Sequence, residues 1–476
     1  MFTPPRLGVG LIYSPVLEPL LQHRPDMADV LEIEPQTHWL AQSTLAGPYA
    51  PYEPALAAIE AHRQHKLVHS VGMPLAGTRP PSPAQMALVA QTARQLGAPW
   101  VSEHLSVGGT PHQAAGFLLP PLQTALGVAT AVANIRAFAK GIGLPVAVET
   151  GVSYLRRKPF EMADGEFVAA VAAEADCGIL LDIHNIWCNE KNGRCSVDDF
   201  VSRLPLDRVW EVHLAGGSVM DGFMLDAHSG PMSAEMADCA RRILRALPNL
   251  GAVNFEIYGS FAELMDDAGI LDIMDGVRGL WSEAGQACGD GIFRAGDGHL
   301  PPAGPEPDAW ENALTAAVWK GDAAGHCDEA DSAALHLYGR LAASFRGSLL
   351  VRALPRTLRF LFIRDPDGVE PLLAGYLKTA GPQLFGPLEA KAFCEWLAQS
   401  FAGDGWLLAL AAYDLALLGM PLNGEGRTVV FPGDPQPLFE ALAEGRLPEF
   451  PDPPEWEIEI LPHPGFVPAQ FPAGPS

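Results

Sequence analysis

Short apolar runs alternate with longer amphipathic stretches through the first part of the chain. The runs are rich in β-branched residues and each passes into polar residues; they span residues 7–14, 30–35, 66–72, 100–107, 144–151, 177–185, 208–216 and 252–259. Helical periodicity fills the intervals, most clearly at residues 83–97 and 122–143. Alternating strands and helices are typical of a parallel sheet, and eight such units predict a (β/α)8 TIM barrel, an α/β fold, over residues 1–287.

The pattern changes after the eighth run. Residues 288–308 are rich in Gly, Pro and Asp and predict a linker. Amphipathic or apolar helices are predicted beyond it, at residues 309–321, 331–345, 369–381, 387–401 and 405–419. Two strand-like pieces follow at residues 427–433 and 455–462. We therefore expect a second domain over residues 309–476, mainly helical with a small α+β end.

Charge and hydropathy exclude some classes of partner. The net charge of -25 and the pI of 4.9 argue against nucleic acid, because phosphate binding requires a basic face. No basic segment precedes a compact apolar run at the N-terminus, so a signal peptide is not expected. The longest apolar stretch, residues 405–420, is too short to span a bilayer and carries Asp414. We expect a cytoplasmic protein without a membrane partner, its seven cysteines reduced.

Histidines and carboxylates gather at the ends of the predicted strands, where a barrel of this type carries its site. The candidate metal ligands are His69, His104, Glu149, Asp182, His184, His213, Asp226, His228 and Glu256. A lone strand-end histidine is more often a structural residue. Five histidines and four carboxylates converging on one mouth, however, would repel and lack partners without a cation. Imidazole and carboxylate together suit Fe, Mn, Zn or Co.

Nine candidates exceed the six ligands of one octahedral ion. We therefore expect either two or three ions or a set of supporting residues around one ion. Strand alternation would place Asp182 and His184 on one face, with Ile183 turned away. Asp182, His184 and Glu103 are the expected catalytic residues.

Other strand-end residues carry weaker signals. Cys188 and Cys195 flank an expected loop and are more simply explained as incidental than as reactive thiols. Trp39 and Trp187 follow strand ends, where they would line the pocket wall or pack in the core.

The ordered strand-end motifs resemble those of the DUF692 family over about residues 5 to 285. The motifs are VLEIEP, VHSVG, SEHLS, AVETGVSYL, LLDIHNIWCNE, EVHLAGG, LDAHSGP and NFEIYG. The family comprises multinuclear non-haem iron-dependent oxidative enzymes, including the methanobactin oxidase subunit. The resemblance implies two or three Fe ions (Fe2+/Fe3+), O2 as co-substrate, and modification of a ribosomally made precursor peptide, at Cys or a C-terminal residue.

By position, the resemblance implies a metal-binding role for every candidate ligand named above except His184, and Glu32 matches an acidic position of the second strand. The chain departs from the family pattern at four strand ends, which read Glu103-His104, Glu149-Thr150, Asp182-Ile183-His184-Asn185 and Glu256-Ile257-Tyr258. His184 stands where the family has Asn, and an imidazole is the better metal ligand.

The second predicted domain resembles the helical partner proteins of such oxidases, which help to recognise the precursor's leader peptide. The motifs that carry this resemblance are LPRTLRFLF, LLAGYLKTAGPQLFG and LALAAYDLALLG. The resemblance implies a fusion that keeps both functions at high effective concentration. The oligomeric state stays open.

Three alternatives remain on the residues alone. A metal-dependent sugar isomerase or epimerase of the xylose-isomerase-like class uses His, Asp and Glu at the same strand ends. A metal-dependent hydrolase of the endonuclease-IV type is a second alternative, although the charge of -25 argues against DNA. A metal-storage or peptide-binding module without catalysis is the third.

Overall fold

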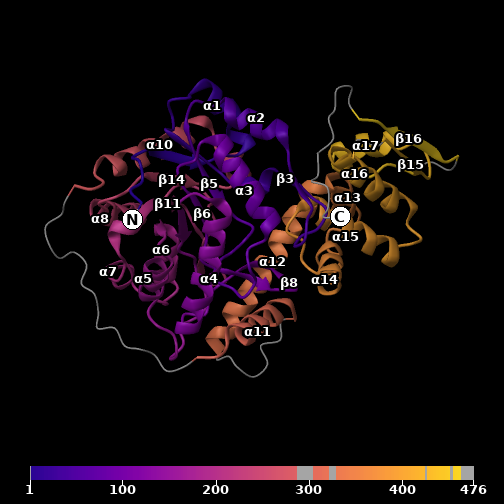
Figure 1. Ribbon diagram of the computed structural model, residues 1–476. Coiled ribbons are helices and arrows are strands. Elements are labelled where there is room, and N and C mark those ends of the chain that lie inside the picture. The colour runs from indigo at the N-terminus through magenta and orange to yellow at the C-terminus, as the bar shows by residue number, and fades with distance from the viewer. Residues whose placement is uncertain (1, 287–303, 321–328, 424–425, 451–453, 463–476) are drawn as a thin grey trace.

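The computed structural model describes residues 2–286, 304–320, 329–423, 426–450 and 454–462. Within residues 2–286, eight parallel strands close into a barrel in the order β1-β14-β11-β10-β9-β6-β5-β2 (Figure 1). The strands are β1 (Gly8–Ile12), β2 (Val30–Ile33), β5 (His65–Ser70), β6 (Val101–His104), β9 (Val146–Glu149), β10 (Gly178–Asp182), β11 (Val209–Ala215) and β14 (Ala252–Glu256). The (β/α)8 barrel predicted from the sequence is confirmed, with each strand shorter than its apolar run.

Helices surround the barrel and bury their apolar faces against it. They are α1 (Glu18–His23), α2 (Glu53–Ala61), α3 (Pro83–Leu96), α4 (Ala125–Ile142), α5 (Asp164–Ala175), α6 (Ile183–Lys191), α7 (Val197–Ser202), α8 (Ala234–Arg245), α9 (Gly259–Ala262) and α10 (Asp267–Ser282). The local sequence sets the ends of α4. Thr124 accepts a hydrogen bond from the Gly127 amide, and Gly143 closes the helix with a left-handed φ of 72°.

The barrel strands are buried on both faces, which explains why their sequences read as nearly continuous apolar runs. Trp100 and Trp210 fill the barrel interior near the amino ends of the strands. Phe2 packs edge-on against Trp210 with ring centroids 4.9 Å apart. Gly178 is required beside Trp210, because a Cβ there would lie 2.2 Å from the indole ring. The barrel interior at the amino ends of the strands is therefore a packed core.

Three hairpins extend the loops that follow barrel strands. They pair β3 (Trp39–Ala41) with β4 (Tyr49–Pro51), β7 (Val107–Thr110) with β8 (Gln113–Leu119), and β12 (Ser218–Met220) with β13 (Phe223–Leu225). Each hairpin leaves the carboxyl end of a strand, so all three border the mouth where the candidate ligands were predicted.

The C-terminal region is helical, as predicted, with a two-stranded antiparallel sheet. Its elements are α11 (Pro307–Lys320), α12 (Glu329–Ala353), α13 (Pro355–Arg364), α14 (Val369–Thr379), α15 (Gly386–Ser400), α16 (Gly405–Asn423), β15 (Arg427–Phe431), α17 (Gln436–Ala443) and β16 (Trp456–Ile460). The sequence did not predict α13 and α17. Both begin beside a proline, which the first turn of a helix tolerates.

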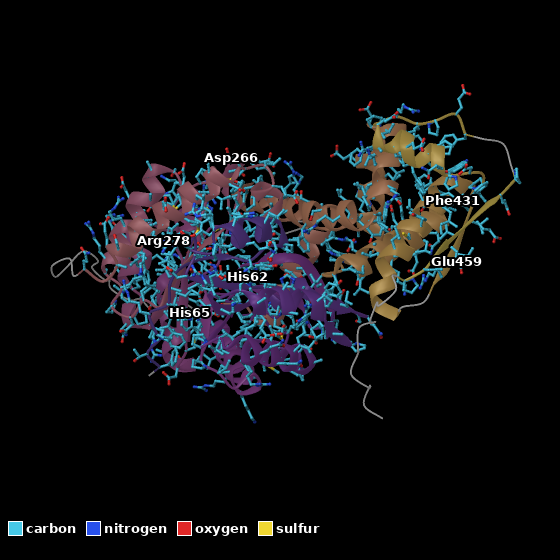
Figure 2. All side chains as sticks on the ribbon, turned by 90° about the horizontal axis from the view of Figure 1, so that it is seen from above. His62, His65, Asp266, Arg278, Phe431 and Glu459 are labelled. Carbon is cyan, nitrogen blue, oxygen red and sulfur yellow. The ribbon has the colours of Figure 1, made fainter. Side chains whose placement is uncertain are left out.

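Two apolar clusters organise this region. Leu358, Tyr376, Phe393 and Phe431 belong to a core of its own, formed by residues from the end of α12 to β16. Figure 2 shows Phe431 and Glu459 at the end of the molecule remote from His62 and Arg278 of the barrel. The second cluster joins α11 and α12 to the mouth of the barrel, through residues such as Tyr338 and Leu335. Residues 288–303 of the predicted linker lie outside the described residues, and the proposed division into domains stays a prediction.

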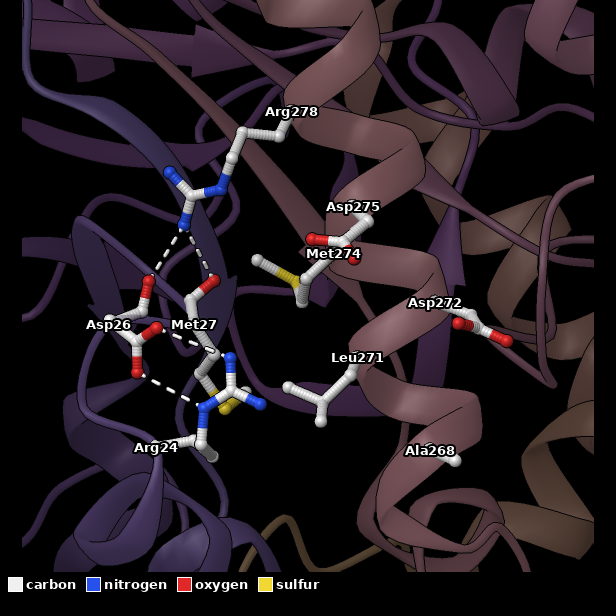
Figure 3. Close-up of a pocket in the computed structure, with 9 residues that line it drawn as sticks. All are labelled: Arg24, Asp26, Met27, Ala268, Leu271, Asp272, Met274, Asp275 and Arg278. Carbon is white, nitrogen blue, oxygen red and sulfur yellow. Dashed lines mark hydrogen bonds and ion pairs between the residues drawn. The ribbon is translucent and has the colours of Figure 1, made fainter.

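A surface pocket of about 330 Å³ lies on the outside of the barrel, along α10 (Figure 3). It lies between α10 and the segment that precedes β2, and Arg24 pairs there with Asp26. Arg278 donates to the backbone carbonyls of Asp26 and Met27. None of the predicted ligands lines this pocket. Among the helices in the described ranges, none has the length and apolar character of a bilayer-crossing helix.

Candidate metal centre

Strand register brings the predicted ligands together at the carboxyl end of the barrel. His104 is in register with Glu149 across β6 and β9, and Asp182 with His213 across β10 and β11. Parallel strands in register project equivalent side chains at one level of the barrel. Residues that are 31 to 45 positions apart in the sequence therefore become neighbours through the sheet alone.

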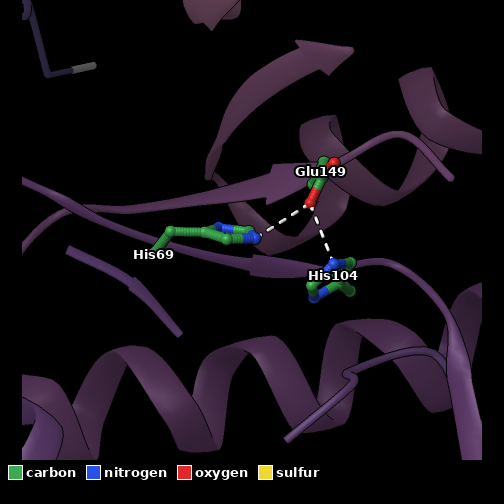
Figure 4. A group of neighbouring side chains, drawn as sticks. All are labelled: His69, His104 and Glu149. Carbon is green, nitrogen blue, oxygen red and sulfur yellow. Dashed lines mark ion pairs between the residues drawn. The ribbon is translucent and has the colours of Figure 1, made fainter. Parts of the chain in front are cut away.

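The first group of potential ligands contains His69, His104 and Glu149 (Figure 4). The Glu149 Oε2 atom lies 3.1 Å from His69 Nε2 and 3.2 Å from His104 Nε2. The far side of each imidazole is held: His69 Nδ1 lies 2.9 Å from Ser102 Oγ, and His104 Nδ1 lies 3.1 Å from Glu103 Oε1. This leaves both Nε2 atoms directed at the same carboxylate oxygen.

The second group contains Glu149, Asp182, His213 and Glu256, all buried. His213 Nδ1 lies 3.0 Å from Glu256 Oε1 and 3.9 Å from Glu149 Oε1. Glu149 thus presents one oxygen to each of two groups. Asp182 is held on its other side by Asn185, whose amide N–H and side-chain amide donate to the two carboxylate oxygens at 2.8 and 2.9 Å.

The third group contains Asp182, Asp226 and His228. His228 Nε2 lies 2.7 Å from Asp226 Oδ1 and 2.9 Å from Glu256 Oε2. His228 has a backbone φ of 45°, a left-handed conformation that is unfavourable for a residue with a Cβ. Asp226 and His228 lie on the loop after β13, so this group depends on loop conformation more than the other two.

Several buried atoms of these groups contact an oppositely charged atom but make no hydrogen bond. Within the described residues they include Glu149 Oε2, His213 Nδ1, Asp226 Oδ1, His228 Nε2 and Glu256 Oε2. Buried polar atoms are rarely left unpaired in native proteins. The potential ligand atoms of each group lie within 4.8 Å of one another. Ligands on opposite sides of one ion lie about 4.2 Å apart, so the imidazole and carboxylate donors fit first-row metal ions after small adjustments.

The pKa values of the ligand residues are shifted by burial and by the charged side chains gathered around them. Burial raises the pKa of Glu149, but attraction to His104 and His69 outweighs it and lowers that pKa to about 2. Burial lowers the pKa of His104, but Glu149 and Glu103 outweigh it and raise that pKa to about 9. For Asp182, burial comes first and repulsion by Asp226 and Glu256 adds to it, so the pKa is well above its usual value. Bound cations would replace the imidazolium charges as partners of these carboxylates.

His184 requires a correction. The sequence predicted a strand through residue 185, with Asp182 and His184 on one face, but β10 ends at Asp182 and α6 begins at Ile183. The Asp182 carboxylate caps the helix by accepting from the Asn185 amide, which explains why the strand stops there. His184 therefore sits in the first turn of α6. Its Nε2 lies 4.0 Å from Asp226 Oδ1 and 3.5 Å from Cys188 Sγ, beside the three groups. Its role as a ligand or catalytic residue stays a prediction.

Glu103 is fully buried behind the first group. Its Oε2 accepts from Ser70 Oγ at 2.7 Å and from the Met73 amide at 2.9 Å, while Oε1 faces His104. This geometry orients the His104 ring, as supporting carboxylates do in metal sites. The direct catalytic role expected for Glu103 stays a prediction.

Glu32, Glu211 and His213 form a fourth group of potential ligands beneath the second group, a polar layer that the sequence reasoning largely missed. His213 Nε2 lies 2.8 Å from Glu32 Oε2, and the Asn254 side-chain amide donates to Glu32 at 3.0 Å and to Glu211 at 2.6 Å. Trp100 Nε1 donates to the other Glu211 oxygen at 2.8 Å. Glu211 and Asn254 precede His213 and Glu256 by two residues, so period-two alternation would have placed them on the same inward face.

Trp39, Trp187 and Cys188 belong to the protein interior, whereas Cys195 is only partly buried. Trp39 and Trp187 are 5% and 7% exposed and pack in the main core of the barrel domain. Cys188 is buried among Asp226 and Asp182, and burial followed by these carboxylates raises the pKa of its thiol well above the usual value. A thiol held neutral in this way is a poor nucleophile.

The fold and the site thus define a (β/α)8-barrel protein whose described residues include three linked groups of potential metal ligands at the carboxyl ends of its strands and a fourth, joined through His213, beneath them. A family model described as "RiPP precursor modification enzyme MbnB/TglH/ChrH" matches residues 6–268, more than half of the chain. The chain belongs to this family, whose members modify the precursors of ribosomally synthesised peptides.

Curated relatives carry the description UPF0276 protein. One from Chromobacterium violaceum is 30% identical over 180 residues, which make up 38% of this chain and 65% of that protein. Another from Anaeromyxobacter sp. is 30% identical over 224 residues, 46% of this chain and 79% of that protein. The chain spans just under two thirds of the first relative's length. The C-terminal helical region lies outside the family match.

Solved structures with similar barrels are more distant. A D-psicose 3-epimerase crystallised in the presence of D-fructose is 14% identical and covers 56% of this chain and 96% of its own, with a TM-score of 0.38. An IolI protein with a zinc atom is 12% identical and covers 58% and 98%, with a TM-score of 0.40. Likenesses this distant carry no functional inference.

Proposed function

We propose that this protein is an iron- and O2-dependent enzyme that oxidatively modifies a ribosomally synthesised precursor peptide, at a cysteine or a C-terminal residue. The observation that carries the proposal is the linkage of three ligand groups, in a chain of the precursor-modifying family, through Glu149 and Asp182. A carboxylate shared by two groups can hold two ions close together, and carboxylate–imidazole sets suit iron.

The residues of each group would hold one ion. His69 and His104 with one Glu149 oxygen form the first site, and His213 and Glu256 with the other Glu149 oxygen form the second. Asp226 and His228 with Asp182 form the third. Iron held by these residues would supply the redox chemistry for oxidation of the peptide by O2.

The chain itself determines from which side a peptide approaches. The side chains of His104 and Asp226 are 17% and 19% exposed, whereas the other members of the three groups are 11% exposed or less. Tyr258 is 52% exposed and its ring centroid lies 4.8 Å from that of His228. A substrate side chain entering beside Tyr258 would reach the third group first, while the buried residues below exclude water from the second.

The C-terminal region is proposed to recognise the precursor peptide. Its α11 and α12 pack against the hairpins and loops of the barrel mouth, so a peptide bound to this region would be held beside the metal centre. Holding both parts in one chain replaces a bimolecular encounter with an intramolecular one.

The test is a reconstitution under controlled O2. The full chain is purified without O2, loaded with Fe2+, and incubated with each short peptide that the genes beside its own encode, with and without O2. We expect a peptide mass change that requires both Fe2+ and O2 and is absent from the Glu149→Gln variant. An unchanged peptide under all conditions would refute the proposal, and epimerisation of a ketose by the Mn2+-loaded or Co2+-loaded protein would establish the sugar-epimerase alternative instead.

A further inference from the structure

Two buried tyrosines connect the C-terminal helices to the third ligand group. Tyr338 lies on α12, and its hydroxyl accepts a hydrogen bond from the backbone amide of Tyr154 at 3.1 Å. The Tyr154 hydroxyl in turn accepts from the backbone amide of Asp226 at 3.3 Å. Tyr338 is fully buried and Tyr154 is 4% exposed. Two hydrogen bonds therefore run from α12 to the backbone of a potential metal ligand.

Apolar packing fixes both tyrosine rings. The Tyr154 and Tyr338 ring centroids are 5.2 Å apart, with the planes inclined at 64°, and Phe223 packs edge-on to Tyr154 at 6.0 Å. The surrounding cluster includes Leu225, the residue before Asp226, and Leu335 of α12. Edge-to-face rings in a buried cluster resist rotation, so the two hydroxyls are held in place.

The position of Asp226 depends on such packing more than the position of a strand residue does. It follows β13, outside the barrel strands that position the ligands of the other two groups. Its near neighbour His228 has the left-handed φ of 45° noted above. A loop in a strained conformation keeps its geometry only when its surroundings determine it.

We infer that Tyr338 and Tyr154 are positioning residues, through which α12 holds Asp226 in the third ligand group. The helical region would then complete the metal centre, in addition to any role in peptide recognition. The inference rests on the proposed function in so far as that group binds a metal ion. Of the three residues, Tyr338 on α12 lies beyond the family match, whereas Tyr154 and Asp226 lie inside it.

The test compares single-hydroxyl deletions in the full-length protein. Tyr154→Phe and Tyr338→Phe remove one hydrogen-bond acceptor each and keep the rings. Tyr376→Phe is the matched control, because its hydroxyl donates to Glu389 within the separate core of the C-terminal region. Each variant is titrated with Fe2+ without O2, and Mössbauer spectra of the 57Fe-loaded protein resolve the individual sites. The signal lost in Asp226→Asn identifies the third site.

We expect the Fe2+ affinity of the third site to fall about tenfold in Tyr154→Phe, the range known for residues that orient ligands, and severalfold in Tyr338→Phe. The signals of the other two sites and the Tyr376→Phe protein should match wild type. If Tyr338→Phe fails to fold by circular dichroism, Tyr154→Phe, which leaves the α12 interface intact, decides the question.

The outcomes separate the two proposals. Wild-type protein that binds no Fe2+ would overturn the proposed function and this inference with it. Wild-type protein that fills three sites, with Tyr154→Phe and Tyr338→Phe indistinguishable from it, would overturn the inference alone. Equal weakening of all three sites would also overturn it, because that pattern indicates general destabilisation and not the positioning of Asp226.

Discussion

Replacing Glu149 with glutamine should remove more bound metal than any change confined to one group. Glu149 presents Oε2 to His69 and His104 at 3.1 and 3.2 Å, and Oε1 to His213 at 3.9 Å. Glutamine keeps one oxygen and replaces the other by an NH2 group, which only donates. Glu149→Gln therefore deprives one group of a ligand atom and both groups of a negative charge.

The magnitude follows from the position of the side chain. Removing a residue that only orients a ligand typically costs 10–100-fold in metal affinity, and a shared direct ligand should cost at least as much at each site. We expect a loss of about 100-fold at the first and second sites, about 2.7 kcal/mol each. Asp226→Asn is the comparison, because Asp226 belongs to the third group alone.

The assay is anaerobic Fe2+ loading of the full chain, followed by elemental analysis and a titration. Glu149→Gln should retain only the ion of the third group, whereas Asp226→Asn should retain the other two. The reasoning fails if Glu149→Gln binds as many ions as wild type with the same affinities. It also fails if the two variants lose equal numbers of ions.

Three further predictions concern residues around the ligand groups. His184→Asn tests the predicted ligand role of His184: its place beside the groups favours an unchanged number of bound ions, which would refute that role, whereas elemental analysis showing one ion fewer would support it. Glu32→Gln should weaken the His213 site about tenfold in an Fe2+ titration, since Glu32 Oε2 holds the other imidazole nitrogen; an unchanged affinity would contradict this. Glu389→Gln breaks a buried pair with Arg346 and should lower the free energy of unfolding by about 3 kcal/mol in urea, a loss that a change under 1 kcal/mol would disprove.

The barrel could be predicted because its signal is local. Each strand is buried on both faces and so appears as an apolar run, and residues such as Thr124 and Gly143 mark the ends of a helix. The start of α6 was missed for a local reason as well. Asp182 ends the strand and caps the helix at the same time, and periodicity alone does not distinguish an inward strand residue from an N-cap.

The candidate ligands could be named from their places at strand ends, but their grouping could not. No spacing along the chain indicates that the two oxygens of Glu149 face different sets of histidines. That sharing depends on barrel closure and on the register of β6 with β9 and of β10 with β11. The layer of Glu32, Glu211 and Asn254 likewise forms only when β2, β11 and β14 come together.

The sequence by itself determined most of the strands and helices and the polar side chains at the mouth, because these properties depend on neighbours a few positions away. Tertiary structure alone decided which atoms meet. The hydrogen bonds from Tyr338 to Tyr154 and from Tyr154 to Asp226 span 184 and 72 positions of the chain. Contacts over such separations arise from the packing of whole elements, for which no local periodicity carries a signal.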